Sequence, residues 1–311
     1  MTNMQDFTFL SGDGKTYLHG ISWLPEGKPV AVLQICHGVA EHIRRYDGFA
    51  RFLNERGVAV VGHDHLGHGE SVKEGDTPVY FGPGNTWQTV VDDIYTLHNR
   101  LRQQFPDVPM VLMGHSMGSF LARTYLIRYP GTVKAAILMG TGWQGSLTVE
   151  AGLAAARVIA AVKGENAASR FVNDLAFGGY NKRFKPNRTA VDWLSADEEN
   201  VDAYIADPLC GADATVGLFR ELLRGVRYNQ SFSHLDRMDG KTPVLLVSGE
   251  CDPVGGMGAG VRQTYREFKR AGVGDCTLKL YPGLRHEILN EKAMQQTVYE
   301  DIWAWMKEKA L

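Results

Sequence analysis

The chain has 311 residues, 44% of them hydrophobic and 22% charged, a composition typical of a globular protein with a large buried core. The formal net charge is -2, with 33 basic and 35 acidic residues interleaved, so the basic surface that nucleic acids require is excluded. The first ten residues do not resemble a signal peptide, and no apolar run is long enough to span a bilayer, so we expect a cytoplasmic protein. The four cysteines lack paired spacing, so we expect neither disulfides nor a zinc site.

Short apolar runs alternate with longer amphipathic segments along most of the chain. Residues 7–10 and 17–24 flank a Ser-Gly-Asp-Gly turn and predict an antiparallel hairpin. Further strand-like runs lie at 30–36, 58–62, 110–113, 135–139, 244–247 and 277–281. Helical segments lie at 45–56, 87–105, 117–129, 261–271 and 294–309. This alternation predicts an α/β fold with a mostly parallel, doubly wound sheet, whose functional loops lie at the carboxyl ends of the strands.

One stretch interrupts the alternation. Residues 141–240 contain no strand-like run, but helical patterns at 149–162, 198–205 and 215–226. The strands before and after the stretch both fit the same sheet. We therefore predict a core domain of residues 1–140 and 241–311, with a helical lid of residues 141–240 inserted after the sixth strand and covering the carboxyl edge.

The segment Gly114-His115-Ser116-Met117-Gly118 fits the pattern G-x-S-x-G, directly after an apolar strand and directly before a helix. This context predicts a serine on a sharp turn, with its hydroxyl exposed and the helix N-terminus directed at developing negative charge. Ser116 is therefore the predicted nucleophile of a serine hydrolase.

A serine nucleophile needs a general base and an acid that orients it. His286 follows the last strand and is the predicted base, whereas His115 is too close to Ser116 in the chain. Asp252 follows the strand at 244–247, which gives the order Ser, Asp, His of α/β-hydrolases. The rival acids are Glu250 and Glu287, the latter too close to His286 in sequence to orient it well.

Two polar loops follow the strands at 30–36 and 58–62. The first, residues 37–42 (HGVAEH), is called the oxyanion loop, because in this architecture it supplies one oxyanion donor. The residue after the nucleophile supplies the other, so the predicted donors are the backbone N–H groups of Val39 and Met117. The second, residues 64–71 (DHLGHGES), holds an acid and two histidines. It either binds a metal or braces the oxyanion loop, and we favour bracing because the mechanism needs no metal or cofactor.

Together these motifs resemble the monoacylglycerol lipase and lysophospholipase branch of the α/β-hydrolase superfamily, often described as serine aminopeptidase S33-like. The resemblance rests on segments 37–46 (HGVAEHIRRY), 64–71 (DHLGHGES), 114–119 (GHSMGS), 251–254 (CDPV) and 285–291 (RHEILNE). It implies that Glu41 and Arg45 contact the alcohol part of the substrate; the alternative is a surface ion pair that anchors the loop. Ala40 departs from the family's usual glycine, and its methyl group would narrow the entrance to the oxyanion hole.

The resemblance implies hydrolysis of an ester between a fatty acyl chain and glycerol or a lysophospholipid head group. The alternatives are a short-chain carboxylesterase, an aminopeptidase and a non-catalytic ligand-binding protein of the same fold. The Ala-rich segment within 149–162 either touches a membrane surface transiently or packs on the domain below. We expect a small-molecule or lipid ester as substrate and no obligate protein partner.

Overall fold

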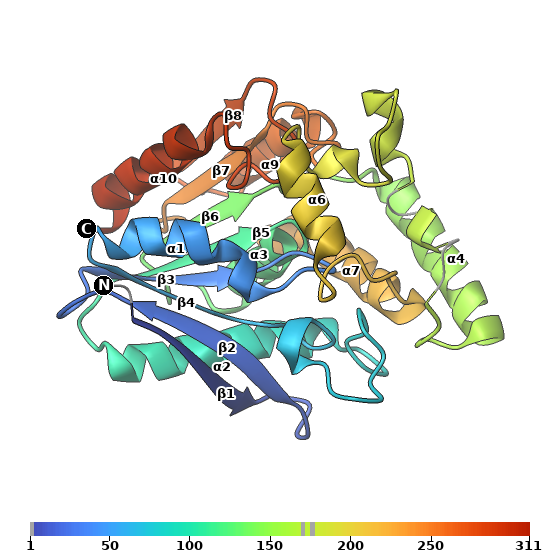
Figure 1. Ribbon diagram of the computed structural model, residues 1–311, viewed down its shortest axis with the longest axis horizontal. Helices are drawn as coiled ribbons and strands as arrows, with labels where there is room; N and C mark the ends of the chain where they lie inside the picture. Colours follow the sequence, from blue (N-terminus) through green and yellow to red (C-terminus); the bar gives the residue numbers. More distant parts are fainter. Residues whose placement is uncertain (1–2, 169–171, 175–177) are drawn as a thin grey trace.

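The computed structural model describes residues 3–168, 172–174 and 178–311, and its eight described strands form one sheet (Figure 1). Their order is β1-β2-β4-β3-β5-β6-β7-β8. β2 pairs antiparallel with β1 and β4, while all other neighbours are parallel. The predicted fold class and N-terminal hairpin are confirmed. The strands are β1 (Asn3–Leu10), β2 (Tyr17–Leu24), β3 (Ala31–Cys36), β4 (Val58–His63), β5 (Met110–His115), β6 (Ala135–Met139), β7 (Val244–Gly249) and β8 (Cys276–Tyr281).

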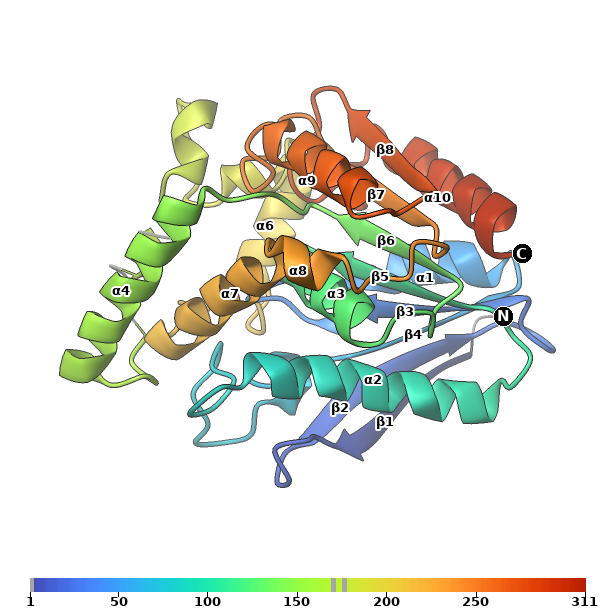
Figure 2. The same cartoon turned by 180° about the vertical axis from the view of Figure 1, so that it is seen from behind.

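Helices cover both faces of the sheet (Figures 1 and 2). One face carries α1 (Asp47–Asn54) and α10 (Gln295–Ala310), and the other carries α2 (Trp87–Gln104), α3 (Met117–Arg128) and α9 (Ala259–Arg270). Strands β3 to β7 are buried on both faces, which explains why their sequences are continuous apolar runs. The helix predicted over 45–56 is divided, because a 3-10 turn, η1 (Ile43–Tyr46), precedes α1.

Between β6 and β7 the chain leaves the sheet, and we call residues 140–243 the cap segment. Its helices gather at one end of the sheet in both views (Figures 1 and 2). Its described helices are α4 (Ser146–Lys163), α6 (Glu198–Ala206), α7 (Val216–Asn229) and α8 (Phe232–Leu235). It also contains the 3-10 turns η3 (Tyr180–Phe184) and η4 (Asp192–Leu194), whereas the 3-10 turn η2 (Gly69–Ser71) follows β4 outside the cap segment. Residues 169–171 and 175–177 of the predicted lid lie outside the described residues, and the division into core and lid stays a prediction. No described helix has the length and apolarity needed to cross a membrane.

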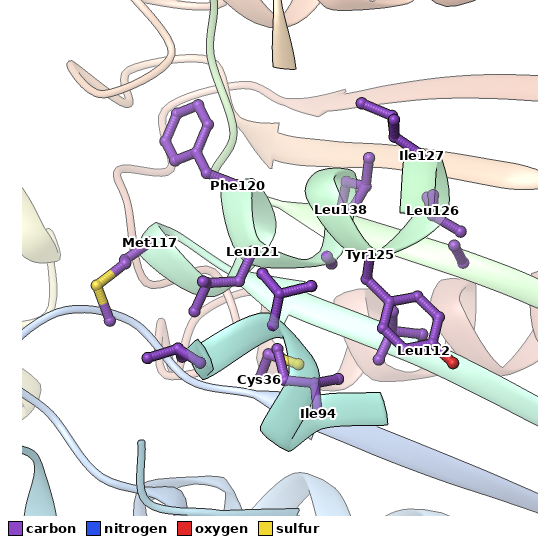
Figure 3. Packing of buried hydrophobic residues seen from close by; sticks show 14 of the residues in the cluster. Cys36, Ile94, Leu112, Met117, Phe120, Leu121, Tyr125, Leu126, Ile127 and Leu138 are labelled. Atoms are coloured by element: carbon purple, nitrogen blue, oxygen red, sulfur yellow. The ribbon is translucent and has the colours of Figure 1, made fainter. Parts of the chain in front are cut away.

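Helix α3 is buried along nearly its whole length. Leu121 and Tyr125 point toward Cys36 of β3 and Ile94 of α2 (Figure 3). On another side the cap segment reaches it, since Asn229 of α7 accepts a hydrogen bond from Thr124 Oγ1 at 2.8 Å and donates to the Phe120 carbonyl at 2.7 Å. The helix that begins directly after Ser116 is therefore held by the sheet and by the cap segment together.

Candidate active site

Ser116 lies on the turn between β5 and α3, with φ 54° and ψ -122°. A positive φ at a non-glycine residue costs on the order of 1–3 kcal/mol, so the surroundings must impose it. The flanking glycines are required by close contacts: a Cβ on Gly114 would lie 2.2 Å from the Gly118 carbonyl, and one on Gly118 would lie 2.0 Å from the Cys36 carbonyl. The strand–turn–helix setting expected for G-x-S-x-G is thus present.

His286 and Asp252 are both buried, and His286 Nδ1 lies 2.9 Å from Asp252 Oδ2. The same carboxylate accepts hydrogen bonds from Ser248 Oγ at 3.1 Å and the Val254 N–H at 2.8 Å. Burial alone would raise the pKa of Asp252, but the imidazole and these donors lower it overall. An ionised Asp252 holds the proton of His286 on Nδ1 and leaves Nε2 as the basic nitrogen.

Nε2 of His286 has no hydrogen-bond partner within the described chain, and His286 and Ser116 line the same cavity. The Ser116 hydroxyl is not hydrogen-bonded to Nε2 in this structure. Unliganded active sites often show such loose contacts, which tighten when substrate binds. The structure therefore brings the three predicted residues to one site, with the His286 ring oriented by Asp252 and beside the cavity that Ser116 lines.

The His286 imidazole is held by packing that the sequence did not reveal. The rings of Trp193 in the cap segment and His115 lie 5.1 and 4.7 Å from it, centroid to centroid. A Cβ on Gly140 would lie 2.9 Å from His286 Cε1, so a side chain there would displace the ring. The backbone of the next residue is also fixed from the cap segment, because the Glu287 N–H donates to the Leu194 carbonyl at 2.8 Å.

Val39 and Met117 lie at the ends of the adjacent strands β3 and β5, where the sheet order reverses. Such a switch point is the usual site of ligand binding in open α/β sheets. Neither backbone N–H donates a hydrogen bond to any part of the chain that the structure describes. Both residues line a cavity together with Ser116, which is the region where the predicted oxyanion donors are needed.

Glu41 and Arg45 form an ion pair whose side chains are only 5% and 11% exposed, so the alternative of a surface ion pair was wrong in its location. Arg45 also binds Glu287 through two hydrogen bonds of 2.7 and 2.8 Å. Glu41 accepts hydrogen bonds from Gly38 N, Tyr46 Oη, His115 Nδ1 and Arg45 Nη1. Burial opposes the charge of Glu41, but His115 and Arg45 lower its pKa well below the usual value. These contacts favour an anchor for the oxyanion loop; contact with substrate stays a prediction for both residues.

The rival acids are engaged elsewhere. Glu287 is bound to Arg45, and Glu250 lies at the surface, 3.6 Å from Arg262. His115 was excluded as the base because of its place in the chain. Its Nδ1 donates a hydrogen bond to Glu41 Oε1 at 3.1 Å.

The loop at 64–71 contacts the oxyanion loop directly. Asp64 accepts hydrogen bonds from the Ile43 N–H at 2.8 Å and the Glu70 N–H at 3.0 Å. The His65 N–H donates to His37 Nε2 at 2.9 Å, which places the proton of His37 on Nδ1, 2.7 Å from the Gly38 carbonyl. This arrangement favours bracing over metal binding by the loop.

A family model described as serine aminopeptidase S33 matches residues 27–293. This chain belongs to that family. It is 32% identical to the monoacylglycerol lipase of Mycolicibacterium smegmatis over 289 residues, 91% of this chain and 90% of that protein. It is 28% identical to the monoglyceride lipase of Homo sapiens over 308 residues, covering 98% and 91% of the two chains. A thermostable carboxyl esterase from Bacillus coagulans, solved in complex with glycerol, shares 26% identity with a TM-score of 0.92 over 100% of both chains. The predicted α/β-hydrolase branch and the prediction of a carboxylic ester hydrolase are confirmed.

Proposed function

We propose that this S33-family ester hydrolase cleaves monoacylglycerols with long acyl chains. The observation that carries the proposal is the meeting of two cavities of different chemistry at Ser116. One, of about 650 Å³, is mainly apolar, and its lining includes Met117, Phe120, Val149, Leu222, Leu223 and Val226. The other, of about 690 Å³, contains His286 and a series of polar groups, including Asn181, Asn187, Thr189 and Asp213. An ester held at Ser116 would extend its acyl chain into the first and its alcohol into the second.

The chemistry of the polar cavity favours glycerol over a lysophospholipid head group. The described residues that line it include carboxylates and amides but neither lysine nor arginine. A phosphodiester would lose its hydration there without gaining a cation, which is unfavourable for a buried anion. Glycerol needs only neutral hydrogen-bond partners, which Asn, Thr and backbone groups supply.

The proposed reaction proceeds in two steps through an acyl-enzyme. Ser116 Oγ attacks the ester carbonyl carbon while its proton passes to His286 Nε2, and the Val39 and Met117 N–H groups bind the oxyanion. Each such donor contributes about 2.7–4 kcal/mol to catalysis in hydrolases where it has been removed. The C–O bond of the ester then breaks, and the alcohol leaves with the proton from Nε2. Water then attacks the acyl-enzyme and gives a proton to Nε2. The bond between the acyl carbon and Ser116 Oγ breaks, the fatty acid leaves, and Nε2 returns the proton to Oγ.

Helix α4 supports a further part of the proposal, transient contact of the predicted lid with a lipid surface. Leu147, Val158 and Val162 of this helix are 86%, 66% and 80% exposed, and Leu147 also lines the apolar cavity. Exposed apolar side chains along a helix, one of which reaches an apolar cavity, are suited to contact with a lipid surface. The triple substitution of these residues by serine is expected to reduce sedimentation with phosphatidylcholine vesicles; unchanged sedimentation would contradict this part alone.

The function is tested by comparing kcat/KM for p-nitrophenyl esters and monoacylglycerols of rising chain length. Each methylene buried in the apolar cavity contributes about 0.8 kcal/mol, or roughly fourfold in kcat/KM, until the cavity is full. A maximum at the shortest esters would favour a short-chain carboxylesterase, and faster cleavage of aminoacyl anilides would favour an aminopeptidase. A fluorophosphonate probe should label the wild type but not Ser116→Ala, and an unlabelled wild type would favour a ligand-binding protein.

A further inference from the structure

Three residues with metal-binding side chains meet where the cap segment touches the loop after β3. They are His42 of that loop and Asp207 and Cys210, which follow α6. Their ligand atoms, an imidazole nitrogen, a carboxylate oxygen and a thiol sulfur, all lie within 4.8 Å of one another. His42 is buried and the other two are half-buried, so the group is partly shielded from solvent.

The local backbone arranges Asp207 and Cys210 in advance. The Cys210 N–H donates to the Asp207 carbonyl at 3.0 Å, which closes a tight turn, and the Leu209 N–H donates to Asp207 Oδ1 at 2.9 Å. Oδ1 is thereby occupied, and Oδ2 faces His42 Nε2 at 2.8 Å. Each side chain thus directs one ligand atom toward the others.

We propose that His42, Asp207 and Cys210 bind one Zn²⁺ ion. Ligand atoms of a tetrahedral zinc site lie about 3.5 Å apart, so movements on the order of an ångström convert the present arrangement into a site. A thiolate and an imidazole select zinc over Ca²⁺ and Mg²⁺, which require mostly oxygen ligands. Water fills the fourth position.

Binding exchanges protons for the metal in a balanced way. The S–H bond of Cys210 breaks, its proton passes to solvent, and a Zn–S bond forms. In the metal-free state the proton of His42 lies on Nε2, where it is donated to Asp207 Oδ2. Solvent takes this proton and returns one to Nδ1, so neutral His42 binds the ion through Nε2 and Asp207 binds through Oδ2. The hydrogen bond between His42 and Asp207 is replaced by their two bonds to the ion.

The site would add to an existing connection between the cap segment and the oxyanion loop. The Ala40 carbonyl accepts hydrogen bonds from Tyr204 Oη and the Gly211 N–H, each at 3.0 Å. Ala40 has a positive φ of 52°, a conformation that needs such support. His42 lies two residues after Ala40 in the oxyanion loop. Zinc bound to His42 would therefore link the oxyanion loop to the segment after α6 a second time and stabilise the loop and that segment.

The test uses the full-length protein freed of metal with EDTA, and Co²⁺ as a spectroscopic probe. Wild type should bind one Co²⁺ with a thiolate-to-metal charge-transfer band, and an equal amount of Zn²⁺ should abolish the band. Zn²⁺ at 100 times its Kd should raise Tm by about 5 °C. Cys210→Ser should lose the band and the rise in Tm, and Asp207→Asn should weaken binding by more than about tenfold.

Cys276→Ser is the matched control, because Cys276 is also half-buried but lies on β8. It should keep the band and the rise in Tm. The proposal is overturned if wild type binds no stoichiometric Zn²⁺, or if Cys210→Ser binds Co²⁺ with the wild-type spectrum. These measurements involve no ester substrate, so they are independent of the proposed function.

Discussion

The ion pairs of Arg45 with Glu41 and Glu287, called here the Arg45 network, allow a test of what positions the oxyanion loop. Glu41→Gln keeps the shape of the side chain but removes its charge. The amide NH₂ would then face Arg45 Nη1, which now donates to Glu41 Oε2 at 3.0 Å, so two donors would meet. Breaking a buried ion pair costs about 3–5 kcal/mol when it leaves a charge uncompensated. Arg45 keeps its two hydrogen bonds to Glu287, so we expect a smaller loss, about 1.5–3 kcal/mol, the range for one charged hydrogen bond.

The assay combines urea unfolding with ester hydrolysis. Glu41 also accepts a hydrogen bond from the Gly38 N–H at 2.6 Å, next to the predicted oxyanion donor Val39, so kcat should fall more than KM rises. Glu300→Gln is the control, because its ion pair with Arg56 is partly exposed and its loss should cost at most about 1 kcal/mol. If the two substitutions lower the unfolding free energy equally, or if Glu41→Gln retains full kcat, the Arg45 network does not position the oxyanion loop.

Three further predictions concern other parts of the fold. Asp252→Asn should lower kcat by on the order of 10⁴-fold with little change in KM, measured by steady-state kinetics, because it removes the anion that orients His286. Tyr204→Phe should lower the unfolding free energy by about 0.5–1.5 kcal/mol in urea titrations, because the buried Ala40 carbonyl loses one of two donors. Burial lowers the pKa of His19, but the carboxylates of Asp64, Asp6 and Glu70 raise it to about 9. The stabilisation by His19 is therefore complete below about pH 6.5 and is lost as pH rises through 9. The difference in unfolding free energy between wild type and His19→Gln should shrink over that range.

The strands and the nucleophile's turn could be predicted because each depends on a local sequence pattern. Strands buried on both faces give continuous apolar runs, and the glycines beside Ser116 are required by contacts of 2.2 and 2.0 Å. The start of the helix predicted at 45–56 was displaced because Asp64, from another loop, accepts the Ile43 N–H and fixes a 3-10 turn there.

The surroundings of the site depend on contacts between distant parts of the chain, which a single sequence does not encode as a pattern. Arg45 and Glu287 are 242 residues apart, and their pairing turns an expected surface ion pair into a buried one. Trp193 packs on His286 from a part of the chain where only helical periodicity was informative. The meeting of His42 with Asp207 and Cys210 was missed for the same reason, since no short motif contains them.

These long-range contacts imply that part of the cap segment holds the loop of the predicted base in place and does not act as a detachable cover. Arg285, next to the predicted base, donates from Nη1 to the carbonyls of Asp192 and Ser195 at 2.5 and 2.9 Å. Arg285→Met should therefore release the loop of the base from the cap segment, and kcat should fall by about 10- to 100-fold while KM changes little, because two charged hydrogen bonds are lost. Arg183→Met, on the exposed surface of the cap segment, is the control and should keep wild-type kinetics. Equal kinetics of the two variants would mean that these contacts do not hold the loop of the predicted base, whereas a selective loss of kcat in Arg285→Met would show that they do.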